Sequence, residues 1–238
     1  MLINNLVETH CHILPAVDDG SHNIETSLKM IKRLQEQGAK AIILTPHYYS
    51  DSVSLEDFLA KRNRALYELQ NALPADAPKL IPAAEVYITK YLFSNDGLER
   101  IAIGNSGYAL IEHPFSDSFS HKTYDRLINL NYEYGIKPIL AHIERYPALI
   151  DDEDLLDDYI DMGCLVQVNI SSFTDAPRHI RKRLIKYLVS GRIHLIGSDC
   201  HNLSSRAPEY EKGVKEIIKK CGSEAIDILE RNANLLIR

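Results

Sequence analysis

The stretch Ala41-Ile42-Ile43-Leu44-Thr45-Pro46-His47 combines two features that recur along the chain. Its first four residues form an unbroken apolar run, which is typical of a strand buried on both faces of a parallel sheet. His47, whose side chain can bind a metal ion, follows that run within three positions. Residues 23–37, which precede the strand, show helical periodicity and end before Gly38, a residue type that commonly caps helices.

Working outward from this stretch, strand-like and helix-like segments alternate over the whole chain. We predict strands at residues 6–9, 41–44, 80–86, 108–111, 138–141, 165–168 and 193–196. We predict helices at residues 23–37, 54–73, 122–134, 151–162 and 177–190 and from residue 208 onward, with a small helical insertion near 91–100. Seven strand–helix units in series favour a closed or nearly closed parallel sheet, with its active site at the carboxyl ends of the strands.

Length and composition limit the remaining possibilities. The 238 residues fit one α/β domain spanning residues 1–238. A net charge of -6 disfavours a nucleic-acid partner. No apolar run approaches the ~18 residues of a membrane-spanning helix, and no signal peptide is evident, so we expect a cytoplasmic protein without membrane insertion. The four cysteines form no C-x-x-C pair, which argues against a disulfide framework or a zinc ribbon.

Each predicted strand is followed by a polar residue, and most of these residues can bind metal ions. The residues are His10, His12, Asp18 and Asp19 after the first strand, His47 after the second, Glu85 and Glu112 at the third and fourth, His142 after the fifth, Asn169 after the sixth, and Asp199 and His201 after the seventh. Seven such positions in register are unusual, because polar groups beside apolar strands carry a desolvation cost. Imidazole and carboxylate donors together suit Zn, Mn or Fe.

These motifs, in the order H-x-H, D-D-G, P-H, A-E-x-Y, L-I-E, A-H-I-E-R-Y, Q-V-N and S-D-x-H-N, resemble the polymerase-and-histidinol-phosphatase (PHP) superfamily. More narrowly, the chain is similar to the PHP-type bacterial protein-tyrosine phosphatases of capsule and exopolysaccharide operons. The resemblance covers nearly the whole chain and implies a distorted, TIM-like (β/α)7 barrel. Glu8 stands where an Asp often precedes the first motif.

The resemblance also implies a three-metal site that holds manganese, iron or zinc. It assigns His10, His12, Glu85 and Asp199 to the first ion, Glu85, Glu112 and His142 to the second, and Asp19, His47 and His201 to the third. Arg145 and Arg206 match the phosphate-binding arginines. The implied substrate is the phosphotyrosine-bearing C-terminal tail of a cognate bacterial tyrosine kinase that regulates polysaccharide assembly. The sequence leaves the oligomeric state open.

Several alternatives remain open. Asp18 can replace Asp19 as the ligand. Cys200 and Arg206 have the C-x5-R spacing of cysteine-dependent tyrosine phosphatases, although the intervening loop lacks glycine. A PHP phosphatase that acts on a small molecule such as histidinol phosphate, and a non-catalytic PHP domain, are the competing functions. Tyr48 and Tyr49 line the mouth of the site or pack within their loop.

Overall fold

The computed structural model describes residue 3 and residues 5–238. Within them, the strands are β1 (Leu6–Glu8), β2 (Ala39–Leu44), β3 (His47–Tyr49), β4 (Lys79–Pro82), β5 (Glu85–Tyr87), β6 (Tyr108–Glu112), β7 (Lys137–Leu140), β8 (Leu165–Asn169) and β9 (Leu195–Gly197). All of their pairings are parallel. One sheet has the order β1-β2-β4, and the other has the order β3-β5-β6-β7-β8-β9. The predicted α/β class with a parallel sheet is therefore confirmed.

The two sheets belong to one distorted barrel, because β2 continues into β3 and β4 continues into β5. Hydrogen bonds from Ala83 N to Leu44 O (2.9 Å) and from Glu85 N to Pro46 O (3.0 Å) connect the two interrupted strands. Next to β1 and β9, the residues that follow them, Cys11 and Cys200, form an isolated parallel bridge. Among the described residues, no regular ladder of hydrogen bonds closes the barrel between β9 and β1. The irregular junctions between strands lie at the strand ends that carry the candidate ligands.

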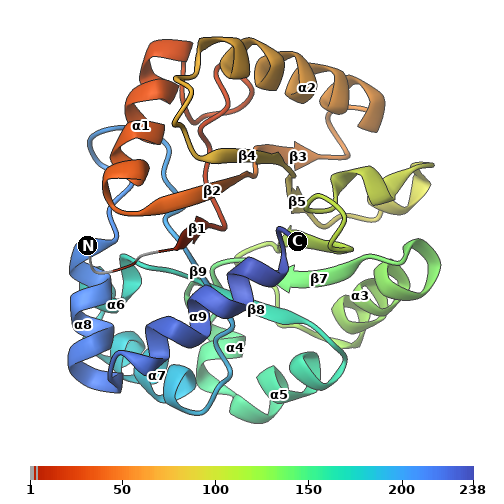
Figure 1. Ribbon diagram of the computed structural model, residues 1–238. Helices are drawn as coiled ribbons and strands as arrows, with labels where there is room; N and C mark the ends of the chain where they lie inside the picture. The colour runs from red at the N-terminus through yellow and green to blue at the C-terminus, as the bar shows by residue number, and fades with distance from the viewer. Residues whose placement is uncertain (1–2, 4) are drawn as a thin grey trace.

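The helices are α1 (Ile24–Glu36), α2 (Leu55–Ala72), α3 (His121–Tyr134), α4 (Pro147–Asp151), α5 (Glu153–Asp161), α6 (Ser172–Asp175), α7 (Arg178–Val189), α8 (Glu211–Cys221) and α9 (Glu224–Leu235). Figure 1 shows most of them surrounding the strands, with α9 crossing one end of the barrel. Side chains cap the amino-terminal ends of the first two helices. The Asn23 side chain accepts a hydrogen bond from Thr26 N, and the Ser54 side chain accepts one from Asp57 N.

Four predicted segments differ from the structure. The single strand expected at 80–86 is divided into β4 and β5, and the extra strand β3 begins at His47. The insertion near 91–100 contains two short 3-10 turns, Leu92–Ser94 and Leu98–Ile101. The helix expected at 151–162 corresponds to α5, which begins at Glu153 because Asp152 caps it by accepting from Leu155 N, and α4 is a separate short helix before it. Gly222, with φ +85°, separates α8 from α9.

Alternate strand residues fill the barrel interior, as the period of two along a strand requires. One apolar cluster joins Val7, Ile43, Ile81, Leu110 and Leu195 from inside the barrel to Ala233 and Leu236 of α9. Helix α9 therefore covers the amino-terminal end of the barrel. The larger cluster packs the opposite strand faces against the surrounding helices. This packing leaves the carboxyl ends of the strands as the end at which polar side chains gather.

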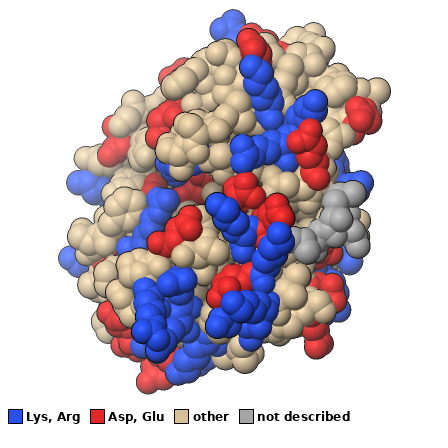
Figure 2. Space-filling view, turned by 90° about the vertical axis from the view of Figure 1, so that its left-hand side faces the viewer, with Lys and Arg blue, Asp and Glu red and all other residues tan. Residues whose placement is uncertain are grey.

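The surface carries charges of both signs. On the face that contains α1 and α8, Lys and Arg side chains gather in the lower half, over α7 and α8 (Figure 2). The net charge of -6 therefore coexists with a local basic region. None of the helices in the described part of the chain has the length and apolar character needed to cross a membrane.

The close approach of α8 to the loop after β8 gives a test of the packing. A Cβ atom at Gly213 would lie 2.5 Å from Ile170 O, whereas one at Gly135, the C-cap of α3, would meet nothing within 4 Å. We expect Gly213→Ala to lower the free energy of unfolding by about 2–3 kcal/mol, as overpacking does. Gly135→Ala should cost about 1 kcal/mol because of its left-handed backbone alone. Equal losses in chemical denaturation would contradict the packing described.

Candidate metal centre

All nine predicted ligand residues converge at the carboxyl end of the barrel. His10 and His12 follow β1, His47 begins β3, Glu85 begins β5, Glu112 ends β6, His142 follows β7, and Asp199 and His201 follow β9, while Asp19 comes from the loop after His12. Seven of the nine are buried; His47 is partly exposed and the Asp19 side chain is 66% exposed. Side chains from strands distant in sequence therefore form one polar cluster, with Asp19 at its open side.

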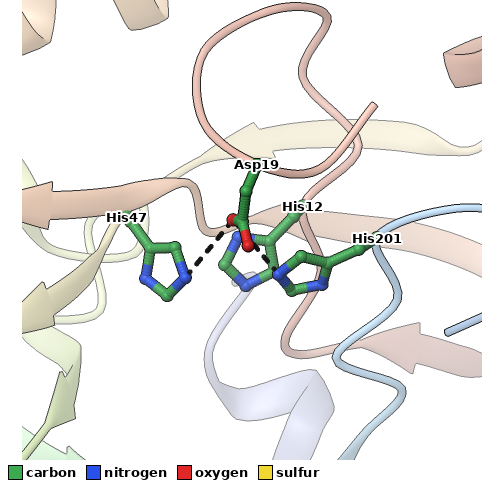
Figure 3. A group of neighbouring side chains, drawn as sticks. All are labelled: His12, Asp19, His47 and His201. Atoms are coloured by element: carbon green, nitrogen blue, oxygen red, sulfur yellow. Dashed lines mark ion pairs between the residues drawn. The ribbon is translucent and has the colours of Figure 1, made fainter. Parts of the chain in front are cut away.

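Three groups within the cluster have donor atoms close enough to hold a metal ion. The groups are His12, Asp19, His47 and His201; His10, His12 and Glu85; and His47, Glu85 and Glu112. The donor atoms of each group all lie within 4.8 Å of one another. In the first group, Asp19 points toward both His47 and His201 (Figure 3), with its Oδ1 atom 3.6 Å and 3.4 Å from their Nε2 atoms.

Glu85 is the centre of the cluster. Its Oε2 atom lies 3.2 Å from both His10 Nε2 and His12 Nε2 and 3.1 Å from His47 Nδ1, and its Oε1 atom lies 3.0 Å from His142 Nε2. Although burial alone would raise it, the charge of His10 and the hydrogen bonds of neighbouring histidines hold the pKa of Glu85 well below its usual range. The carboxylate is therefore ionised and shared among four imidazoles.

The same contacts make two histidines strongly basic. Against the effect of burial, Glu112 and Glu85 raise the pKa of His142 to about 9. Against the same effect, the hydrogen bond with Asp18 and the contacts with Asp199 and Glu85 raise the pKa of His12 well above its usual value. Protons thus supply positive charge that the buried carboxylates require. Divalent cations can supply the same charge, and binding them releases protons from such ligands.

Several donor atoms of the cluster lie near charged groups but form no hydrogen bond, which also fits metal ligands. Within the described residues, Glu85 Oε2, His47 Nδ1 and His201 Nε2 are buried and have no hydrogen-bond partner. Such buried polar atoms are rare unless another group satisfies them. Imidazole nitrogens and carboxylate oxygens are the donors that Zn, Mn and Fe accept in proteins. The residues present therefore fit a site for several transition-metal ions.

The two aspartates of the D-D-G motif have different surroundings. Asp18 is engaged through both oxygens: Oδ2 lies 2.7 Å from His12 Nδ1 and accepts from His47 N (3.0 Å), and Oδ1 accepts from Gly20 N (3.0 Å). These contacts orient His12, which is the usual work of a carboxylate behind a metal-binding histidine. Asp19 reaches the cluster directly. The geometry therefore favours Asp19 over Asp18 as the ligand.

A further layer of polar residues supports the candidate ligands, and of these we had named Asn169 but not Gln167. Gln167 Oε1 accepts from His142 N (2.7 Å) and lies 3.3 Å from His10 Nδ1, while Gln167 Nε2 donates to Asn169 Oδ1 (3.0 Å). Asn169 Nδ2 donates to Asp199 Oδ2 (2.8 Å). The only sequence signal for this layer is the polar alternation in Q-V-N, which turns both side chains into the barrel.

Glu8 belongs to the same supporting layer. It is fully buried, and its Oε1 atom accepts hydrogen bonds from His10 N (3.0 Å), Ser198 N (2.9 Å) and Tyr210 Oη (3.0 Å). It therefore ties the loop after β1 to the loop after β9, which between them carry five of the candidate ligands. Burial raises the pKa of Glu8, against these hydrogen bonds.

The two predicted arginines meet at Asp199. Arg145 Nη2 lies 2.6 Å from Asp199 Oδ2, and Arg206 Nη2 lies 2.7 Å from Asp199 Oδ1. Both guanidinium groups are partly exposed, with 35% and 37% of their side-chain surface accessible. They can therefore contact a ligand that enters the cluster from solvent.

Aromatic residues border the cluster on the side of β3, β5 and β6. Tyr49 is 38% exposed, with its ring 5.2 Å from that of His47 and 5.5 Å from that of Tyr87. Phe115, which sequence reasoning missed, is 56% exposed and lies 6.2 Å from the His142 ring. Tyr48 is instead buried against Phe58, so only Tyr49 of this pair reaches the mouth.

The position of Glu85 gives a test of the metal centre. We expect Glu85→Gln to lower the metal content by about one ion or more per chain, because its carboxylate contacts four candidate ligands. Glu144→Gln is the matched control. Glu144 is partly buried and lies two residues from His142, but its carboxylate binds Asn169 N and Ser172 Oγ instead. Elemental analysis of both purified variants would measure the difference, and equal metal contents would contradict the assignment.

Comparison with known sequences shows the family to which the chain is similar. The family model for capsular polysaccharide synthesis, CpsB/CapC, matches residues 6–238. The chain is 31% identical to the tyrosine-protein phosphatase CpsB of Streptococcus pneumoniae over 92% of each protein. It is 32% identical to the putative tyrosine-protein phosphatase CapC of Staphylococcus aureus over 98% of this chain and 91% of that protein.

Solved structures with a similar fold include members of the same family. A structure from work on YwqE of Bacillus subtilis and CpsB of Streptococcus pneumoniae, described as unique metal-dependent tyrosine phosphatases, superposes with a TM-score of 0.83 at 25% identity, covering 98% of this chain and 94% of that chain. The phosphotriesterase homology protein of Escherichia coli, covering 99% of each chain, shares the fold alone, with a TM-score of 0.56 at 12% identity. With a family model matched over nearly its whole length, the chain belongs to the CpsB/CapC family of capsular polysaccharide synthesis.

Proposed function

We propose that this protein is a metal-dependent protein-tyrosine phosphatase. The observation that carries the proposal is the placement of Arg145 and Arg206 on Asp199, at the edge of a nine-residue donor cluster. Metal ligands and two partly exposed guanidinium groups at one place are what hydrolysis of a phosphate monoester requires. The names of the family relatives, tyrosine-protein phosphatases CpsB and YwqE, support the same reaction.

The proposal includes about three divalent transition-metal ions, Mn, Fe or Zn. His10, His12, Glu85 and Asp199 would hold the first ion, Glu85, Glu112 and His142 the second, and Asp19, His47 and His201 the third. The geometry adds that His12 also lies within the third group, and that His47 lies near Glu85 and Glu112. When bound, such ions activate water and neutralise phosphoryl charge.

Arg145 and Arg206 bind the phosphoryl group in this proposal. Each guanidinium offers a planar fork of N–H donors, which suits phosphate oxygens better than an ammonium group does. Their contacts with Asp199 hold both forks at the cluster, so little reorientation is needed when substrate arrives. Asn169 restrains Asp199 from behind through its 2.8 Å hydrogen bond.

The aromatic border favours a tyrosine substrate. Tyr49 and Phe115 present exposed rings next to His47 and His142, and Phe115 also lies under the Arg145 guanidinium at 5.9 Å. A phenyl ring whose phosphate is held in the cluster can pack against these surfaces. The phenolate of tyrosine is also a good leaving group that needs little protonation.

The surroundings of Cys200 oppose the alternative thiol mechanism. Its side chain is fully buried, its backbone pairs with that of Cys11, and the Arg206 guanidinium binds Asp199. A thiolate nucleophile requires access to substrate and an electropositive setting. The C-x5-R spacing therefore does not form a phosphate cradle around the thiol.

The finer parts of the proposal concern partner and location. The substrate would be the phosphotyrosine-bearing tail of a cognate bacterial tyrosine kinase that regulates capsular or exopolysaccharide synthesis, and the enzyme would act in the cytoplasm. The family's association with capsular polysaccharide synthesis supports the pathway. The four cysteines are free, as expected in a reducing compartment.

Two substitutions at neighbouring positions test the mechanism. Cys200→Ser should retain most of the wild-type kcat on an aryl phosphate, because the thiol does not face the cluster. Asp199→Ala should lower kcat/KM about 100-fold or more, because it removes a ligand and the anchor of both arginines. Thermal melting would show that both variants are folded, and metal analysis would show that Cys200→Ser keeps its ions. Loss of activity in a folded, metal-loaded Cys200→Ser protein would overturn the proposed mechanism.

A substrate panel tests the tyrosine preference. The wild-type enzyme should hydrolyse a phosphotyrosine peptide in preference to a phosphoserine peptide and to histidinol phosphate. Phe115→Ala should lower kcat/KM for the phosphotyrosine peptide by about 2- to 10-fold, the value of one aromatic contact. Tyr132→Ala removes a 90% exposed ring on α3 and should have no effect. A clear preference for histidinol phosphate would instead indicate the small-molecule branch of the superfamily.

A further inference from the structure

A polar cavity of about 450 Å³ adjoins the metal cluster at Asp199 and the two arginines that contact it. Arg145, Arg206, Asp199 and Asn169 belong both to its lining and to the site described above. The rest of the lining is Arg33, Ser171, Thr174, Asp175, Ser198, Ser204, Ser205, Ala207, Glu209, Lys212 and Gly213. The cavity is too large for a phosphoryl group alone and falls within the range of sites that enclose a larger ligand.

The walls of the cavity come from four separate parts of the chain. Arg33 lies on α1, Thr174 and Asp175 on α6, Lys212 and Gly213 on α8, and the loop between β9 and α8 supplies the fourth wall. Gly213 allows α8 to approach Ile170 closely, which places Lys212 at the rim. The first turn of α8 is therefore at the cavity, where its unpaired N–H groups favour negative charge.

The cationic side chains of the cavity differ in how they are neutralised. Arg145 and Arg206 both contact the single carboxylate of Asp199, and Arg33 forms a 2.8 Å ion pair with Glu209. Lys212 is exposed and forms no ion pair with any residue of the described chain. Two guanidinium groups on one carboxylate and a free ammonium leave the cavity with an unbalanced positive charge, apart from Asp175 at its edge.

The basic region continues outside the cavity. Helix α7 begins three residues after Asp175, and its Arg178 and Lys182 are exposed and form no ion pair within the described residues. Figure 2 shows Lys and Arg gathered over α7 and α8 in this part of the surface. The local charge is opposite to the net charge of -6, so it would attract an acidic peptide segment without making the whole protein a polyanion binder.

We propose that this cavity binds a second anionic group of the substrate peptide, a short distance along the chain from the phosphotyrosine in the metal cluster. The group is either the carboxylate of an acidic side chain or the phosphate of a neighbouring phosphotyrosine. The inference rests on the proposed phosphatase function and specifies its substrate. Lys212 and Arg33 are the specificity residues, and the hydroxyls of Ser171, Ser198 and Ser205 in the lining offer further donors. The aromatic border receives the tyrosine ring.

The test compares three peptides of identical length with the metal-loaded enzyme. Each contains one central phosphotyrosine, flanked by neutral residues, by Glu residues, or by a second phosphotyrosine. We expect kcat/KM for either anionic peptide to exceed that for the neutral peptide by about 3- to 10-fold at low salt. The ratio should approach one in about 0.5 M salt, where exposed charges are screened. A preference for one anionic peptide identifies the source of the second charge.

Variants of α8 assign the effect to the cavity. Lys212→Glu should abolish or reverse the preference, and Lys212→Gln should give an intermediate ratio. Lys219→Glu is the matched control, because it makes the same charge change at an exposed position of the same helix outside the cavity lining. It should keep the wild-type ratio. Each ratio is formed within one variant, so a general loss of activity does not affect it.

The outcomes separate the inference from the function on which it rests. Equal kcat/KM values for the three peptides, with phosphotyrosine hydrolysis intact, would overturn the anion site and leave the phosphatase proposal standing. So would an equal loss of preference in Lys212→Glu and Lys219→Glu, because the effect would then belong to overall charge. A metal-loaded wild-type enzyme that hydrolyses none of the three peptides would overturn both proposals.

Discussion

The carboxylate of Glu85 is the group on which the arrangement of the site depends. It is almost completely buried and lies within 3.2 Å of His10, His12, His47 and His142. A buried negative charge is strongly unfavourable unless positive or hydrogen-bonding groups surround it. The strands that carry these histidines must therefore meet around one point, and cations at that point satisfy the carboxylate and the imidazoles together.

The supporting layer and the backbone both hold this arrangement in place. Gln167 and Glu8 bind backbone N–H groups of candidate ligand residues, and Asn169 binds Asp199 directly. Two candidate ligand residues, His142 and Asp199, adopt positive φ angles of 33° and 53°. Such conformations are unfavourable for residues other than glycine and persist where surrounding contacts enforce them. The barrel thus stabilises a strained arrangement that turns these side chains toward the cluster.

Two neighbouring surfaces of the cluster, the aromatic border and the cationic cavity, have different chemistry and can bind different parts of one substrate. Tyr49 and Phe115 lie beside His47 and His142, whereas the cavity that Arg33 and Lys212 line adjoins Asp199, Arg145 and Arg206. Apolar ring surfaces gain by removal from water, whereas cationic groups act over longer distances and steer charged ligands. A peptide whose aromatic residue carries the phosphate can contact the aromatic rings and the cationic cavity at once, which a small alkyl phosphate cannot.

Sequence patterns were sufficient for the parallel α/β class, for most helices and for the residues that gather at the strand ends. The reason is that apolar strands followed by polar residues fix which end of the barrel is polar, whatever the details of packing. Helix caps such as Asn23 and Ser54 were also predictable, because they depend on contacts within four residues. The same locality explains why the division of the strand at 80–86 was missed: Pro46 and Ala83 interrupt two neighbouring strands together, and neither strand shows this alone.

Only the tertiary structure decided which polar residues act together. Asp18 and Asp19 are adjacent in sequence, yet one orients His12 and the other reaches His47 and His201. Phe115 and Lys212 belong to no motif, and their proximity to the site comes from strands and helices that are distant along the chain. Sequence determined the chemical types available at the strand ends, because that follows from local order. Distances, burial and the sharing of one carboxylate by four histidines were decided by the packing of the barrel, because they depend on where all the strands meet.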